Sequence, residues 1–215
     1  FRISNYPTLI LTMPSFSEDE LNLIADRNFF ERKVAVSNKI RGAYAQLRDE
    51  LKDYMKPETY LAPEGVDFTQ GKISGGEKQY DLPYLFLDFP RRFSKEAIFA
   101  YRSIFWWGHY FLFTLILSGE LLPEYQKRIS QGWKGLATRE DYVAVTNDPF
   151  EWRHQEKFFR VAHLISQKPL EKELRNLPFL KLITFIPFSD PRIETGALVK
   201  IGLQTFQDWE FIFTR

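Results

Sequence analysis

Residues 98–117 read IFAYRSIFWWGHYFLFTLIL, and this stretch decides the fold. Aromatic and β-branched residues, which are enriched in strands, dominate it on both sides of Gly108 and His109. We therefore predict two long strands, 98–107 and 110–117, joined by a turn at these two residues. Apolar side chains would line both faces of the hairpin, which places it centrally in a sheet covered on both sides. A helix over the whole stretch is the alternative that periodicity leaves open.

Before the hairpin, the sequence predicts two helices. Ser17 and Glu20 have the spacing of a capping box, which begins a short helix ending near Arg27. A second, longer helix begins at Asn28 and carries one apolar stripe with spacings of three and four residues. The stripe consists of Ile40, Tyr44, Leu47, Leu51 and Tyr54. Pro57 ends this helix, because proline cannot continue the hydrogen-bond ladder.

A glycine-rich stretch, residues 71–78, lies between the long helix and a strand predicted over 83–89. It reads GKISGGEK, with Glu77 where a phosphate-binding loop requires lysine. A carboxylate at that position would repel phosphate, so we interpret the glycines as the tip of a hairpin.

After the hairpin, helices and strands alternate. Helices are predicted over 121–130 and 169–176, and strands over 142–145 and 180–188. Ser189-Asp190-Pro191 then has the form of a helix start, and the stripe of an amphipathic terminal helix runs from Ala197 to Ile212. This order predicts a single α+β domain over 1–215. We expect a central, mostly antiparallel sheet that contains the aromatic hairpin and is covered by helices, including the long N-terminal and the terminal helix.

The composition excludes several classes of protein. The 215 residues contain no cysteine, which rules out disulfides, thiolate zinc sites, iron–sulfur clusters and a cysteine nucleophile. The 29 basic and 28 acidic residues leave a net charge of +1, which does not favour a dedicated nucleic-acid binder. The three histidines show no metal-binding spacing, and we expect neither a metal nor a cofactor.

One uncharged segment requires a membrane test. Residues 103–119 contain no formal charge, but the run is shorter than the about 20 apolar residues of a spanning helix, and it contains Gly108 and His109. We therefore predict no membrane span, and expect a soluble, cytoplasmic protein.

Two hypotheses for the function come from the residues. In the first, a non-catalytic protein binds a ligand or partner through an aromatic groove. Adjacent Trp106 and Trp107 point to opposite faces of an extended strand, so one of them can line such a groove, together with Arg102. An aromatic sheet face could also support a homodimer. We favour this hypothesis because no catalytic motif is present.

The second hypothesis is a cofactor-free enzyme, such as a hydrolase. His154 with Glu151 or Glu156 could act as a general base, since a histidine near a carboxylate titrates near neutrality. The pairing depends on whether this segment is a strand or a helix. Arg91 and Arg92 could hold an anionic group of the substrate.

The motif Leu82-Pro83-Tyr84 followed by an alternating strand and a long aromatic hairpin resembles two uncharacterised bacterial families. The order of elements is similar to YktB-like proteins and to the domain-of-unknown-function family 2461. Residues 180–188, then Ser189-Asp190, and the helix ending at Trp209 follow in the equivalent order. The resemblance implies an α+β fold and no activity. Glu77, Asp81 and Leu85 depart from the polar residues that the second family carries around its Pro-Tyr pair.

Overall fold

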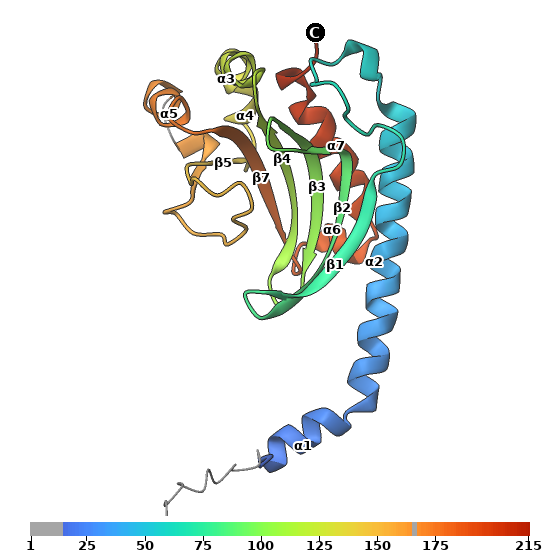
Figure 1. The fold of residues 1–215 in the computed structure, drawn as a ribbon. Helices are drawn as coiled ribbons and strands as arrows, with labels where there is room; N and C mark the ends of the chain where they lie inside the picture. Colours follow the sequence, from blue (N-terminus) through green and yellow to red (C-terminus); the bar gives the residue numbers. More distant parts are fainter. Residues whose placement is uncertain (1–14, 165–166) are drawn as a thin grey trace, which may run out of the picture. The chain divides into compact units, whose positions relative to one another are not determined.

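The computed structural model describes residues 15–164 and 167–215 (Figure 1). The chain divides into two compact units, of which the first ends at Asn38. The first unit contains helix α1 (Glu18–Ala25) and the beginning of helix α2 (Arg27–Tyr54). Ser17 and Glu20 form the predicted capping box, in which each side chain accepts a hydrogen bond from the other residue's backbone amide. The remainder of α2 belongs to the second unit, which holds the sheet.

The sheet has seven strands in the order β1-β2-β3-β4-β7-β5-β6, and every pairing is antiparallel. The strands are β1 (Lys72–Gln79), β2 (Leu82–Phe93), β3 (Ile98–Trp106), β4 (Tyr110–Ser118), β5 (Tyr142–Ala144), β6 (Phe159–Val161) and β7 (Phe179–Pro187). The predicted hairpin is β3–β4, paired from Phe99 with Leu117 to Trp106 with Tyr110. Gly108 closes it with a φ of +73°, a conformation that favours glycine. The α+β class is confirmed, and the helical alternative for this stretch is wrong.

One face of the sheet packs against helices. The apolar stripe of α2 is buried there from Ile40 to Leu51, whereas Tyr54, its predicted last member, is exposed. Helix α3 (Leu122–Gln131) and the terminal helix α7 (Leu198–Trp209) pack on the same face. The β4 residues on this face alternate along the strand: Phe111, Phe113, Leu115 and Leu117. The short helices α4 (Trp133–Leu136), α5 (Gln167–Leu174) and α6 (Pro191–Glu194) connect the outer elements.

The opposite face forms a second, smaller core. Ile104 and Trp106 of β3, Leu112 of β4 and Ile183 of β7 lie there. The loop 145–158, between β5 and β6, covers this face, and its Trp152 ring is buried against them. This loop and the sheet surface beneath it contain the candidate site.

The prediction of a hairpin tip at the glycine-rich stretch is wrong, because these residues form β1 at the edge of the sheet. A Cβ atom on Gly75 would lie 2.4 Å from the Tyr84 carbonyl oxygen, so glycine is needed here for close strand approach. The turn itself consists of Tyr80 and Asp81, whose φ angles are +49° and +64°.

Among the described residues, no helix is long and apolar enough to cross a membrane. The uncharged segment 103–119 that prompted this question is mostly β3, β4 and their turn.

Candidate functional site

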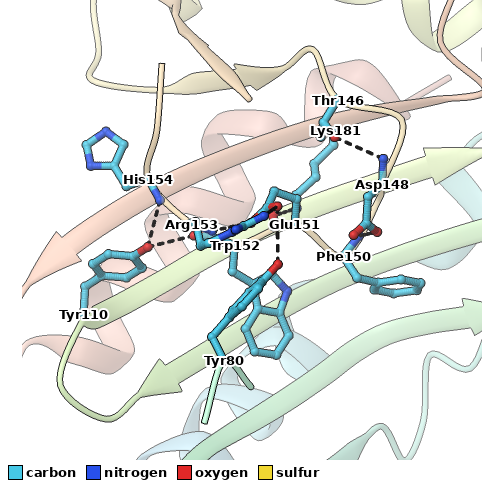
Figure 2. Close-up of polar contacts among 10 residues, drawn as sticks. All are labelled: Tyr80, Tyr110, Thr146, Asp148, Phe150, Glu151, Trp152, Arg153, His154 and Lys181. Atoms are coloured by element: carbon cyan, nitrogen blue, oxygen red, sulfur yellow. Dashed lines mark hydrogen bonds and ion pairs between the residues drawn. The ribbon is translucent and has the colours of Figure 1, made fainter. Parts of the chain in front are cut away.

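A buried lysine holds the loop 145–158 on the sheet. Lys181 lies on β7 with its side chain fully buried, and its Nζ atom donates hydrogen bonds to the carbonyl oxygens of Pro149 (3.0 Å) and Glu151 (2.6 Å). Burial lowers the pKa of Lys181 to about 7, because a charged amine is poorly solvated inside a protein. Figure 2 shows the lysine beneath the loop, with Asp148 to Arg153 arranged around it.

The carboxylate of Glu151 is buried and fully engaged. Arg153 donates to both of its oxygens, at 2.9 Å from Nε and 2.5 Å from an Nη atom, and the Tyr80 hydroxyl lies 3.4 Å from one of them (Figure 2). Burial alone would raise the pKa of the Glu151 carboxyl, but the hydrogen bonds and charge of Arg153 lower the pKa below its ordinary value. Glu151 is therefore ionised at neutral pH and paired.

Tyr80 reaches this carboxylate from the β1–β2 turn, at a cost in backbone strain. A left-handed φ of +49° is uncommon for a bulky residue. The Arg153 guanidinium lies over the ring, 4.3 Å from its centroid, and the Trp106 ring contacts it with centroids 5.8 Å apart. The contacts of the side chain thus compensate for an unfavourable backbone conformation.

Tyr110 supports the next part of the loop. Its hydroxyl donates a hydrogen bond to the Trp152 carbonyl oxygen (2.8 Å) and accepts one from the His154 amide (3.0 Å) (Figure 2). Burial raises the pKa of Tyr110 to about 12, so the hydroxyl keeps its proton and can fill both roles. Residues 151–155 consequently follow a path that is neither helix nor strand, and both secondary structures considered for His154 are wrong.

Beside this cluster is an aromatic pocket of about 250 Å³. We call it the ring pocket, and it is lined by Tyr80, Trp106, His109, Tyr110, Arg153, His154 and Gln155. The His109 imidazole stacks on the Trp106 indole with centroids 3.6 Å apart, and the His154 imidazole stacks on Phe185 at 4.4 Å. Both histidines are nonetheless solvent-exposed, so their outer atoms are available to a bound molecule.

The ring pocket is close to electrically neutral. Partial burial lowers the pKa of both His109 and His154, which favours uncharged imidazoles at neutral pH. The charge of Arg153 is offset by Glu151. A neutral imidazole offers one donor and one acceptor nitrogen, so the pocket combines flat apolar surfaces with a few polar atoms at its rim. Such a site suits a planar heteroaromatic ring.

The structure brings together some of the residues singled out from the sequence. Trp106 and His154 share the ring pocket, and Glu151 supports it through Arg153. Glu156 is exposed, and its backbone carbonyl oxygen accepts a hydrogen bond from Arg160. Trp107 lies just beyond the end of β3 and packs on Phe105, against the larger core.

The three arginines from the sequence analysis have other partners. Arg102 forms a two-pronged ion pair with the buried Asp88 and lies over the rings of three phenylalanines. Arg91 pairs with Asp67 at 3.5 Å, and Arg92 donates to the Glu64 carbonyl oxygen. Arg91 and Arg92 thus hold the segment before β1, and neither lines the ring pocket.

Three important residues were missed. Lys181 is the one charged residue in the strand sequence FLKLITFIP, on the same face as Ile183, and this interruption was a detectable signal. Tyr80 and Tyr110 gave no such signal, because the contacts that make them important come from residues 42 to 71 positions away.

A larger cavity of about 530 Å³ lies beside α7 and the end of β7. Its principal charged groups are already paired: Arg139 with Asp141 and Asp208, and Arg192 with Asp190. It contains none of the site residues predicted from the sequence. Over the described part of the chain, no group of three or more histidine or carboxylate side chains is placed to hold a metal ion.

No protein-family model, curated protein or solved structure matches this chain. The likeness to the two uncharacterised bacterial families therefore stays a prediction. The fold defines the chain as an α+β protein with a seven-stranded antiparallel sheet.

Proposed function

We propose that this protein is a non-catalytic binding protein whose ring pocket accepts one planar heteroaromatic ring of a ligand. The observation that carries the proposal is that three distant segments converge there. Tyr80 comes from the β1–β2 turn, His109 from the β3–β4 turn and His154 from the loop over the sheet. Such convergence of aromatic side chains with a few polar atoms is typical of ligand sites.

The size of the ring pocket limits the ligand. Pockets for drug-sized molecules span about 300–1,000 Å³, and this one is about 250 Å³. It therefore fits one ring system, with the rest of a larger ligand outside. The ring would stack against the exposed imidazole or tyrosine faces and exchange hydrogen bonds with the histidine nitrogens.

The alternative, an enzyme based on His154 and a carboxylate, has less support. Both Glu151 oxygens accept hydrogen bonds from Arg153, and the His154 ring packs on Phe185 and Tyr142. A paired histidine base of this kind needs a carboxylate within hydrogen-bond reach of its imidazole to orient it. No such carboxylate contact to the His154 ring occurs within the described residues.

A thermal-unfolding screen tests the proposal. The probes are small heteroaromatic compounds such as indoles, purines and pyridines, each paired with a saturated-ring analogue of similar size. A ligand at about 100 times its Kd should stabilise the folded protein by about 2.7 kcal/mol. We expect stabilisation by at least one aromatic probe and none by its saturated analogue.

Variants then locate the binding. His109→Ala and His154→Ala should each weaken the affinity at least tenfold, because each removes a stacking surface and a polar contact. Glu156→Ala, in the same loop but outside the ring pocket, is the matched control and should bind normally. Equal stabilisation by aromatic and saturated probes, or full affinity in both histidine variants, would contradict the proposal.

A further inference from the structure

Large apolar side chains are unusually exposed at the beginning of the described chain. Between Phe16 and Val36, eight of them have exposed fractions of 40% to 61%. They are Phe16, Leu21, Leu23, Ile24, Phe29, Phe30, Val34 and Val36. Further along α2, by contrast, the apolar stripe from Ile40 to Leu51 is buried in the core. A cluster of exposed apolar side chains of this kind marks an interaction surface.

Helix α1 has no internal reason to be stable. It contains eight residues, and none of them is buried. Isolated helices shorter than about 12–15 residues are marginal in water, and helices in proteins gain most of their stability from packing. The capping box fixes where α1 begins but does not cover its apolar side chains. A packing partner for α1 is therefore required.

The charges of this region indicate the partner. Residues 18–26 carry four carboxylates and no basic side chain, whereas residues 27–38 carry three basic side chains and one carboxylate. One part is acidic and apolar, and the next is basic and apolar. Each part is thus complementary to the other in both charge and hydrophobicity.

The acidic part, residues 18–26, cannot fold back and pack on the basic part, residues 27–38, of the same chain. Asp26 is the single residue between α1 and α2, and its carboxylate oxygen accepts the Phe29 amide at the start of α2 (2.9 Å). Two antiparallel helices packed side by side require a connection of about 2–5 residues. α1 therefore cannot pack on residues 27–38 of its own chain, whereas a second copy offers the same two complementary parts.

We propose that residues 16–38 form a homodimer interface, in which α1 of one copy packs on residues 27–38 of a second copy. A two-fold axis makes the acidic part meet the basic part twice, because each copy contributes both. The apolar side chains lie between them, and the charges set the register and orientation. This proposal does not depend on the function proposed for the ring pocket.

Charge reversal provides the test. The acid-reversed variant carries Glu18→Lys and Asp19→Lys, which leave the Glu20 capping contact intact, and the base-reversed variant carries Arg27→Glu, Arg32→Glu and Lys33→Glu. The molar mass in solution is measured by light scattering after size-exclusion chromatography. We expect the original protein to have twice the 25.5 kDa chain mass, and each variant alone to be a monomer, because like charges then face each other.

Mixing the two variants separates pairing between chains from other effects. The mixture should form a dimer containing one chain of each kind, since acidic and basic parts are again complementary. Lys78→Glu with Lys95→Glu, two exposed positions elsewhere, is the control and should remain dimeric. A monomeric original protein, or variants that stay monomeric when mixed although circular dichroism shows them folded, would overturn the proposal.

Discussion

The Nζ atom of Lys181 lies 2.6 Å from the backbone carbonyl oxygen of Glu151, so a buried amine on the sheet fixes the backbone of the loop above it. A second bond, to the Pro149 carbonyl, uses another proton of the same amine. An uncharged amine has two protons, and both are then used. This matches a pKa that burial lowers to about 7. The loop that carries His154 therefore depends on a lysine whose charge opposes its burial.

This relationship predicts an unusual dependence of stability on pH. The unfolded lysine has a pKa near 10.4 and the folded one near 7, so between these values only the unfolded chain holds the extra proton. Stability rises with pH wherever the unfolded state binds more protons. From pH 7 to 9.5, Lys181 should add roughly 2–3 kcal/mol to the free energy of unfolding, at about 1.4 kcal/mol per pH unit for one proton.

Lys181→Met isolates this contribution. The variant has no amine to ionise, so urea unfolding at pH 7, 8 and 9.5 should show a difference between the original protein and the variant that grows with pH in favour of the original. Tyrosine ionisation near pH 10 affects both proteins alike and cancels in the difference. A difference that stays constant with pH would mean that the lysine remains charged when folded.

Asp88 and Arg102 should be tolerated in the core only together, so that removing one of them destabilises the protein more than removing both. Both side chains are largely buried, and the Arg102 guanidinium lies about 5 Å from the centroids of Phe86 and Phe93. Arg102→Met leaves a buried carboxylate without its partner and should cost about 3–5 kcal/mol in urea unfolding. The double variant Asp88→Leu with Arg102→Met should recover most of that loss. If the double variant lost more stability than Arg102→Met alone, this account of the pair would be wrong.

Two glycines should respond to alanine in opposite directions. Gly75→Ala forces a Cβ to within 2.4 Å of the Tyr84 carbonyl oxygen and 2.7 Å of Leu85, so it should destabilise by about 1–3 kcal/mol. Gly42→Ala, in helix α2 with no neighbour within 4 Å, should stabilise by about 0.5–1 kcal/mol. Thermal unfolding of both variants measures the contrast. Similar effects at the two positions would show that the close approach of β2 to Gly75 does not exclude a side chain there.

Much of the fold was predictable from local patterns. The β3–β4 hairpin, the stripe of α2 and the terminal helix follow from periodicity, which depends only on near neighbours. The β1 strand was not predictable from such local patterns, because Gly75 and Gly76 favour turns locally. They lie in a strand because they pair with Leu85 and Tyr84 of β2. Pairing between strands overrode the local preference there.

The site was predictable only in part, for a related reason. His154, Glu151 and Trp106 could be selected by residue type. Their arrangement depends on Tyr80, Tyr110 and Lys181, whose partners are distant in sequence. The same contacts show why Glu151 pairs with Arg153, two residues along the chain, and not with His154.

The most direct test of the ring pocket uses the indole N–H signals of the five tryptophans in a ¹H–¹⁵N NMR spectrum. Trp106 lines the pocket and donates its indole N–H to the Gln79 carbonyl oxygen at 3.1 Å, whereas Trp107, Trp133 and Trp209 belong to the opposite core. On titration with the best heteroaromatic probe, we predict that the Trp106 signal shifts in a saturable manner and that those three do not. A probe that binds while leaving Trp106 unmoved would contradict the central claim.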